Sequence, residues 1–432
     1  MMRGMDDVRE LTALNGAPAG LDALEARLRQ DLEWLELPGK EWVPPRVVDG
    51  RRVRDVVVIG AGMCGLTACA AMIRLGMRNI VAYDRAPAGH EGPWVTYARM
   101  RNLRSPKILT GPALGMPAMT FRAWYEARFG RAAWDALGRI PRTLWMEYLV
   151  WYRRVLGLPA ENEVHVTSVR PHGADLLALD LQRPGGAEQV LARHVVLATG
   201  RDGLGGPFVP EMAHRVDHRF WAHSADDIDF AALRGRHVGV VGGGASAMDN
   251  AATALEAGAA RMDLFIRRFD IPRVNKFTGI GSPGVVHGFA ALPDEWKWRF
   301  LHYVRGEQTP PPHDSTLRVS QHPNAYFHVG SPIVSLAQDG DALTVRTPKG
   351  EYGLDFLIFA TGFGFDLSRR PELAELAPHI RLWRDRFPPP ADMASSNSHF
   401  DFRRFEGLGV KLHQEGGSTI TAGVVMAWRR RA

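Results

Sequence analysis

The sequence has little cysteine and no long apolar run. Its 432 residues include two cysteines, Cys64 and Cys69, which is unlike a disulfide-stapled secreted protein. Residues 1–20 carry charged side chains and no apolar core, so no signal peptide is expected in them. No stretch approaches the ~20 apolar residues needed to cross a bilayer. We therefore expect a cytoplasmic protein without a membrane partner.

Charge of one sign is not concentrated anywhere in the chain. The formal net charge is +6, and the arginines that dominate it are scattered. A nucleic-acid-binding surface would gather them in a patch or stripe, so we expect no nucleic-acid partner. Part of the positive excess can attract a phosphorylated cofactor. The apolar share of 45% is ordinary for a globular protein, and 432 residues exceed one core, so two or three lobes are expected.

The N-terminal part of the chain predicts a helix. Leucines recur at helical spacing from Leu21 to Leu35, with charged residues between them. The segment Trp42–Pro45 breaks this helix and leads into the first strand. Residues 1–50 are expected to be an N-terminal helical extension, which either packs on the main body or binds a partner.

The first predicted strand runs into a glycine loop. Residues 56–59 are β-branched, as in a buried parallel strand, and the sequence GAGMCG follows them. In such a loop Gly60 allows a tight bend, Gly62 lets the backbone approach a pyrophosphate, and Gly65 lets the next helix lie close to the strand. The N-terminus of that helix adds free N–H groups, which suit a diphosphate.

An acidic residue follows where a ribose would need one. A helical stretch to about Leu75 and a short strand, Ile80–Tyr83, end at Asp84. In this type of site a carboxylate about 20 residues beyond the loop accepts hydrogen bonds from the ribose hydroxyls. FMN has no adenosine ribose, so the pattern predicts FAD.

A second unit of the same kind lies near the middle of the chain. A strand is predicted at His237–Val241, followed by GGGASA at residues 242–247. A helix to about Ala257 and a strand at Met262–Ile266 complete the unit. The three small positions of the loop are occupied by Gly242, Gly244 and Ala247.

The second unit ends on basic residues. Its last strand is followed by Arg267 and Arg268, where the first unit has Asp84. An acid would repel a 2′-phosphate, whereas guanidinium groups bind it with charge-assisted, bidentate hydrogen bonds. The pattern predicts NADPH, unless the two arginines are merely surface charges.

Each glycine loop is followed by a meander that leads into a closing strand with the sequence Ala-Thr-Gly. The first meander covers residues 163–193 and the second covers 333–354. We therefore expect an α/β fold with two Rossmann-like dinucleotide-binding domains, each with a β-meander insertion. The expected divisions are 51–215 for the first part of the FAD-binding domain, 216–330 for the NADPH-binding domain with a substrate-region insertion, and 331–432 for the return to the FAD-binding domain and the C-terminal segment.

The two cysteines argue against a disulfide reductase. Cys64 and Cys69 both fall in the predicted loop and helix of the first unit, five residues apart. Five residues of helix rise by about 7.5 Å, which is beyond comfortable disulfide reach. They are interpreted as packing residues, and electrons leaving a flavin then need another acceptor, such as oxygen, a quinone or a protein.

Between residues 56 and 363 the chain resembles the flavin-containing and N-hydroxylating monooxygenases. Besides the two loops, the resemblance rests on Gly92-Pro93-Trp94, on the segment 102–107, on His223-Ser224 and on Ala360-Thr361-Gly362-Phe363. It implies that NADPH reduces the flavin and that NADP+ stays bound. Oxygen then forms a C4a-hydroperoxyflavin, which oxygenates a small-molecule substrate.

The resemblance also implies catalytic residues in the segment 102–107. A hydroperoxide needs a donor that holds it and a dry pocket that protects it. Asn102 is expected to be that donor, and Arg104 or Lys107 to supply positive charge near the flavin or the phosphates. The alternative is that these are ordinary loop residues. The expected cofactor-binding residues are Gly60, Gly62, Gly65, Asp84, Arg85, Trp94, Gly200, Gly242, Gly244, Ser246, Ala247, Arg267, Arg268 and Gly362, with no metal ligand.

Some features depart from the family pattern. The residues ahead of His223 do not fill the usual Phe-x-Gly-x-x-x-His signature, and no Gly-Asp pair follows Gly362. The ending is abrupt, so the native C-terminus is expected to be degenerate, shortened or a reading-frame artefact. The aromatic-rich stretch 277–329 is expected to line a substrate pocket or to pack in the core. A reductase that serves a quinone or a protein and an impaired flavin-binding relative remain alternatives, and a homo-oligomer is left open.

Overall fold

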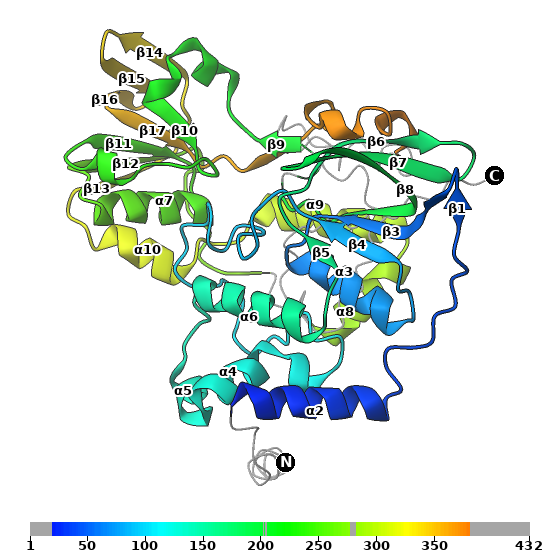
Figure 1. The fold of residues 1–432 in the computed structure, drawn as a ribbon. Helices are drawn as coiled ribbons and strands as arrows, with labels where there is room; N and C mark the ends of the chain where they lie inside the picture. The colour runs from blue at the N-terminus through cyan, green and yellow to red at the C-terminus, as the bar shows by residue number, and fades with distance from the viewer. Residues whose placement is uncertain (1–19, 202, 204, 277–281, 381–432) are drawn as a thin grey trace.

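The computed structural model describes residues 20–201, 203, 205–276 and 282–380. The expectations for residues 1–19 and for the C-terminal segment from 381 therefore lie outside the described residues. Figure 1 shows two lobes, with strands β3–β8 in one and β10–β17 in the other. Within the described residues, no helix has the length and apolar character that a bilayer crossing requires.

The N-terminal helix α2 (Leu21–Trp34) forms as the leucine spacing predicts. Its buried face carries Leu24 and Leu28, each 1% exposed. These leucines join the core of the first lobe, where α2 packs against α4. The helix is therefore part of the main body, which is the first of the two interpretations that the sequence allowed.

The first lobe contains a six-stranded sheet in the order β5-β4-β3-β8-β7-β6. Its centre is β3 (Arg54–Ile59), whose residues from Asp55 to Ile59 are all buried. Helix α3 (Met63–Arg74) follows the glycine loop and packs on β3 and β4. The other strands are β4 (Ile80–Tyr83), β5 (Ala160–Glu161), β6 (His165–His172), β7 (Leu176–Arg183) and β8 (Gly186–Leu197).

The expected meander at residues 163–193 leads into its closing strand without a break. Strand β8 is continuous from Gly186 to Leu197 and contains both. Its first part pairs with β7 and its second part pairs with β3. No turn-forming residue interrupts residues 189–197, so one strand serves both neighbours.

Helices between β4 and β5 build an aromatic core below the sheet. Phe121 is fully buried, and it contacts Trp124, Trp134, Trp145 and Tyr148. Together these rings pack the three helices against one another. The helices are α4 (Phe121–Phe129), α5 (Arg131–Ala136) and α6 (Arg142–Val155).

The second lobe contains a parallel sheet in the order β10-β17-β11-β12-β13. A three-stranded antiparallel sheet of β14, β15 and β16 lies next to it (Figure 1). Helices α7 (Ala245–Glu256) and α10 (His313–Ser320) pack on each other. The strands are β10 (Trp221–His223), β11 (His237–Val241), β12 (Arg261–Ile266), β13 (Ala325–Val329), β14 (Ser335–Asp339), β15 (Ala342–Thr347), β16 (Gly350–Leu354) and β17 (Phe356–Phe359).

The second lobe extends further than the sequence suggested. The chain was expected to return to the first domain at residue 331, but β17 lies between β10 and β11 in the second sheet. The return occurs at β18 (Phe363–Phe365), which pairs with β9 (Gly205–Pro207) on the outgoing path. A buried parallel strand needs neighbours on both sides, and β10 and β11 supply them.

The remaining elements are short or peripheral. Strands β1 and β2 form a two-stranded hairpin, and α8 and α9 lie between β12 and α10 in the sequence. Their bounds are β1 (Val47–Val48), β2 (Arg51–Arg52), α8 (Pro283–Gly288) and α9 (Asp294–Glu307), and those of the 3-10 helices are Pro117–Met119, Glu211–Arg215, His218–Phe220, Ala231–Leu233, Phe289–Ala291, Leu367–Arg369, Pro371–Leu373 and Ala377–His379.

Candidate functional site

The first glycine loop has the geometry that its spacing predicts. Gly60 has a φ of 102°, and a side chain there would overlap the carbonyl of Ala198. A Cβ at Gly65 would overlap the carbonyl oxygen of Gly60, so the helix can lie this close only without a side chain. Gly62 is the N-cap of α3, and nothing lies within 4 Å of its added Cβ. The loop thus leaves open space at the positive end of a helix, which fits a diphosphate.

Asp84 holds this loop together. Its Oδ2 accepts a hydrogen bond from the amide of Ala61 at 2.8 Å, and its Oδ1 accepts one from the amide of Ala86 at 2.8 Å. Each carboxylate oxygen can accept a further hydrogen bond, so Asp84 can still take ribose hydroxyls. Arg85 is exposed beside it.

The second loop repeats the first. Gly242 has a φ of 134°, and a Cβ there would lie 2.8 Å from the carbonyl oxygen of Ala360. Gly244 is the N-cap of α7 and has open space around its added Cβ. Ser246 is half-buried in the first turn, and Ala247 is fully buried. Both loops therefore pair a glycine with the carbonyl of a closing strand and leave a helix N-terminus open.

Sequence reasoning missed one glycine of the second loop. A Cβ at Gly243 would lie 2.9 Å from the side chain of Ile266 on β12. The run Gly242-Gly243-Gly244 was the available signal, but the spacing of the motif assigns no role to its middle position.

The two arginines after β12 lie at the edge expected for them. Arg267 is exposed and Arg268 is half-buried. The backbone carbonyl of Arg268 accepts a hydrogen bond from Gly330 at 2.6 Å, which fixes this turn. The adjacent strand end also holds the loop, because Gly242 donates to the carbonyl of Phe265 at 3.0 Å. Both guanidinium groups thus follow a strand that lies directly beside the second loop.

The closing strands end in glycines with left-handed backbones. Gly200 has a φ of 81° and Gly362 has a φ of 79°. The carbonyl of Gly362 accepts a hydrogen bond from the amide of Phe208 at 2.8 Å. It also lies 2.9 Å from Nε2 of His223, a side chain that is 1% exposed.

His223 is held as a neutral ring. Its Nδ1 accepts a hydrogen bond from the amide of Ala225 at 3.1 Å, so Nε2 carries the proton that is donated to Gly362. Burial lowers the pKa of His223 below its ordinary value of 6.5. The histidine therefore fixes the turn after β17.

The segment 102–107 does not form one cluster. Asn102 pairs with Pro141 through its backbone, and its side chain lines a small pocket together with Arg104. Lys107 donates instead to the carbonyl of Trp134 at 2.6 Å, and its ammonium lies 4.8 Å from the centre of the Trp134 ring. The charge of Lys107 is thus occupied at the end of α5, which differs from the role that the resemblance implied.

Arg104 connects the two lobes. Its Nη2 donates to Oδ2 of Asp249 at 3.1 Å, and Asp249 lies on α7 with its side chain 3% exposed. The other oxygen of Asp249 accepts from Ser315 of α10 at 2.6 Å. A buried carboxylate on the helix of the second loop therefore organises a guanidinium group of the first lobe.

The pocket at this contact has a volume of about 150 Å³. Sequence reasoning missed its walls from α10 and from the turn before α6, because they belong to no motif and meet the first lobe only after folding. The lining residues are Arg101, Asn102, Leu103, Arg104, Arg139, Pro312, Asp314, Ser315 and Arg318.

Trp94 packs in the protein core. Its ring meets Trp145 edge to face at 6.2 Å, and its carbonyl accepts a hydrogen bond from Arg142. The sequence analysis expected Trp94 among the cofactor-binding residues, and the structure shows that its ring also packs against the helices. Stacking on a flavin stays a prediction.

Both cysteines are free thiols in α3. Burial raises the pKa of Cys69 to about 12 and also raises that of Cys64. A thiol must lose its proton to attack a disulfide, so neither is suited to that chemistry. Their interpretation as packing residues is confirmed.

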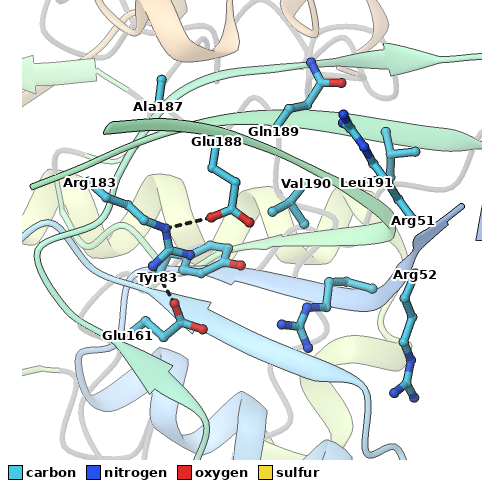
Figure 2. A pocket seen from close by; sticks show the side chains of 11 residues that line it. Arg51, Arg52, Tyr83, Glu161, Arg183, Ala187, Glu188, Gln189, Val190 and Leu191 are labelled. Atoms are coloured by element: carbon cyan, nitrogen blue, oxygen red, sulfur yellow. Dashed lines mark hydrogen bonds and ion pairs between the residues drawn. The ribbon is translucent and has the colours of Figure 1, made fainter. Parts of the chain in front are cut away.

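A larger cavity of about 810 Å³ lies where the meander faces β3–β5 (Figure 2). Arg183 pairs there with Glu161 at 2.6 Å and with Glu188 at 2.8 Å, and its guanidinium lies over the ring of Tyr83. None of the predicted catalytic or cofactor-binding residues lines this cavity. Among the described residues, no group of three His, Cys, Asp or Glu side chains is placed to hold a metal ion.

Comparison with known sequences adds independent findings. A profile of the family described as pyridine nucleotide-disulphide oxidoreductase matches residues 54–277. The chain is 43% identical over 396 residues to a FAD-dependent urate hydroxylase from Xanthomonas campestris pv. campestris. That match covers 91% of this chain and 82% of the relative.

Comparison with solved structures confirms the fold. The cadaverine monooxygenase of desferrioxamine biosynthesis from Erwinia amylovora, solved bound to FAD, superposes with a TM-score of 0.64 at 16% identity, over 79% of this chain and 85% of that one. An ornithine N-hydroxylase from Kutzneria sp. 744, solved with reduced FAD, NADP+ and L-ornithine, gives 0.60 at 20% identity, over 76% and 85%. These likenesses confirm the expected α/β fold with two Rossmann-like domains.

Proposed function

The chain belongs to the pyridine nucleotide-disulphide oxidoreductase family, and from this we propose that it is an NADPH-dependent FAD monooxygenase that hydroxylates urate. The observation that carries the proposal is the 43% identity to a FAD-dependent urate hydroxylase across 91% of the chain. Such coverage includes both glycine loops and the contact between the lobes. The enzyme is a flavoprotein oxidoreductase that acts on a small molecule.

The residues of the first loop fit FAD. Gly62 leaves open space at the N-terminus of α3, and Asp84 keeps acceptor capacity for an adenosine ribose. When bound, FAD supplies the redox chemistry by accepting a hydride and activating oxygen. The protein contributes binding, orientation and the exclusion of water.

The residues of the second loop fit NADPH. Gly244 leaves the N-terminus of α7 open for the diphosphate. Arg267 and Arg268 follow the adjacent strand and can bind a 2′-phosphate with charge-assisted hydrogen bonds. Within the same lobe, His223 holds the turn at Gly362 through a proton on Nε2.

Oxygen is the electron acceptor in this proposal. A disulfide substrate would need a reactive thiol, and burial raises the pKa of both cysteines. Asn102 and Arg104 line the pocket at the lobe contact, where an amide donor and a guanidinium can hold a small substrate. Delivery of electrons to a quinone or a protein is the alternative.

The experiment measures NADPH oxidation, oxygen uptake and urate loss in the FAD-loaded enzyme. We expect urate to accelerate NADPH oxidation, with one urate molecule and one O2 molecule consumed per NADPH. Ornithine and lysine are the matched negative substrates. Rapid NADPH oxidation that requires a quinone and leaves urate intact would establish the reductase instead.

A further inference from the structure

The small pocket between the lobes has walls that carry mainly positive charge. Arg101, Arg104 and Arg139 come from the first lobe, and Arg318 comes from α10. Asp314 is the only carboxylate among the residues that line it. The wall therefore presents four guanidinium groups to one carboxylate.

Other acids stand behind this wall and orient the arginines. Asp249 accepts a hydrogen bond from Arg104, and Glu256 accepts two hydrogen bonds of 2.8 and 2.9 Å from Arg318. Glu256 also pairs with Arg101 at 2.9 Å. Because a guanidinium has five N–H donors, each of these arginines keeps N–H groups that these contacts do not use.

One donor in the wall is buried without a partner. Nε of Arg104 has no hydrogen-bond acceptor among the described residues. Arg139 donates through Nη1 to the carbonyl of Arg104 at 2.6 Å, and its Nε lies 3.6 Å from Asp314. A buried, unpaired donor costs free energy unless an acceptor reaches it.

The start of α10 adds to the same wall. The helix begins at His313 after Pro312, and no side chain caps its first turn. Its free backbone N–H groups and partial positive charge favour an anion. This reinforces the arginines, since Pro312 and Ser315 both line the pocket.

We propose that this pocket binds a small anion with two adjacent acceptor atoms, held by Arg104, Arg139 and Arg318. Pockets for larger ligands have volumes of about 300–1,000 Å³, so 150 Å³ suits one small ring system or one phosphate. Two sources share this chemistry. One is urate, which is an anion at neutral pH and whose choice rests on the proposed function, and the other is free inorganic phosphate, which does not.

The test is calorimetric titration of the FAD-loaded protein with urate and with inorganic phosphate, separately and in competition. Arg139→Gln removes one guanidinium from the wall and spares the Arg104–Asp249 contact. It should weaken binding of the anion about tenfold to a hundredfold. Arg139→Lys keeps the charge without the planar fork, so it should recover part of that loss.

The matched control is Arg131→Gln, on the exposed surface of α5, where Arg131 pairs with Asp135. It should bind as the wild type does, and thermal unfolding should show that all variants are folded. Loss of urate binding in Arg139→Gln identifies urate as the ligand of the pocket. Loss of phosphate binding identifies inorganic phosphate as the ligand.

Unchanged affinity of Arg139→Gln for both anions overturns the proposal, as does the absence of binding to the wild type. The proposed function is decided separately by urate consumption. If Arg139→Gln turns urate over at the wild-type rate and with the wild-type KM, the proposed function stands and the proposed anion site is refuted. If phosphate binding depends on Arg139 and the enzyme does not consume urate, the anion site stands and the proposed function is refuted.

Discussion

Asp249 on the helix of the second loop accepts a hydrogen bond of 3.1 Å from Arg104, which belongs to the first lobe. The carboxylate is 3% exposed, while the arginine side chain is 34% exposed. Each glycine loop lies in a different lobe, so this pair is one of the contacts that join the lobes, together with Arg101–Glu256 and Arg139–Asp314. Because the carboxylate is buried, removing only one partner of this pair is costly, since it leaves the other charge without a counterion.

The first prediction concerns this pair. Asp249→Asn keeps the shape and removes the charge that balances Arg104, so the free energy of unfolding should fall by about 1–3 kcal/mol. Chemical denaturation measures it. The control is Asp135→Asn, whose exposed pair with Arg131 should contribute less than about 1 kcal/mol. Equal losses in both variants would contradict a special role for the contact between the lobes.

The second prediction separates the two loops. Gly62→Ala and Gly244→Ala each place a methyl group in open space, so both variants should fold. Gly62→Ala should lose FAD, which absorbance after gel filtration measures. Gly244→Ala should keep FAD and weaken NADPH binding. Gly65→Ala is the contrast, because its Cβ would overlap the carbonyl of Gly60 and should destabilise the protein itself.

The third prediction concerns the choice of nucleotide. Replacing Arg267 and Arg268 by Ala removes up to two charge-assisted contacts of about 1.5–3 kcal/mol each. The KM for NADPH should rise by about one to several powers of ten at ~1.4 kcal/mol per tenfold, while that for NADH changes little. A parallel rise for both nucleotides would mean that the arginines serve the fold.

The fourth prediction concerns coupling. If Asn102 donates to activated oxygen, Asn102→Ala should leave FAD binding and reduction by NADPH nearly intact and release more hydrogen peroxide per NADPH. Loss of one preorganised donor costs about 2.7–4 kcal/mol in the step that it serves. Lys107→Met is the neighbouring control. Because Lys107 donates to the carbonyl of Trp134, Lys107→Met should lower the free energy of unfolding by about 1 kcal/mol. It should leave the hydrogen peroxide released per NADPH unchanged.

The fifth prediction concerns pH. The pKa of His223 is lowered by burial, so the folded protein binds this proton less readily than the unfolded chain. The stability contributed by the neutral ring is full above about pH 6.5 and is lost as pH falls through the folded pKa. The melting temperature should therefore drop on acidification, and it should drop less in His223→Gln, whose side chain does not titrate. Identical acid profiles would refute this assignment.

The glycine loops and their adjoining elements could be predicted because their causes are local. The roles of Gly65 and Asp84 follow from residues within one strand–loop–helix–strand unit, whereas the close contact at Gly60 is with Ala198, directly after β8. The same applies to the second meander, because β14, β15 and β16 all lie within the expected residues 333–354.

What could not be predicted depends on contacts between distant segments. Nothing near Arg104 in the sequence indicates that Asp249 will face it, because the pair forms only when the lobes meet. Arg104 or Lys107 was expected to supply charge near the flavin or the phosphates, yet Lys107 donates to a carbonyl at the end of α5. The boundary at residue 331 failed for the same reason, since the place of β17 depends on β10 and β11.

The pairing of β9 with β18 has a mechanical consequence. The chain leaves the first lobe along one of these strands and returns along the other, and backbone hydrogen bonds join them. Two independent tethers would let the lobes swing and twist separately. Because β9 and β18 are joined by backbone hydrogen bonds, we expect the two connecting segments to move together when the lobes move relative to each other.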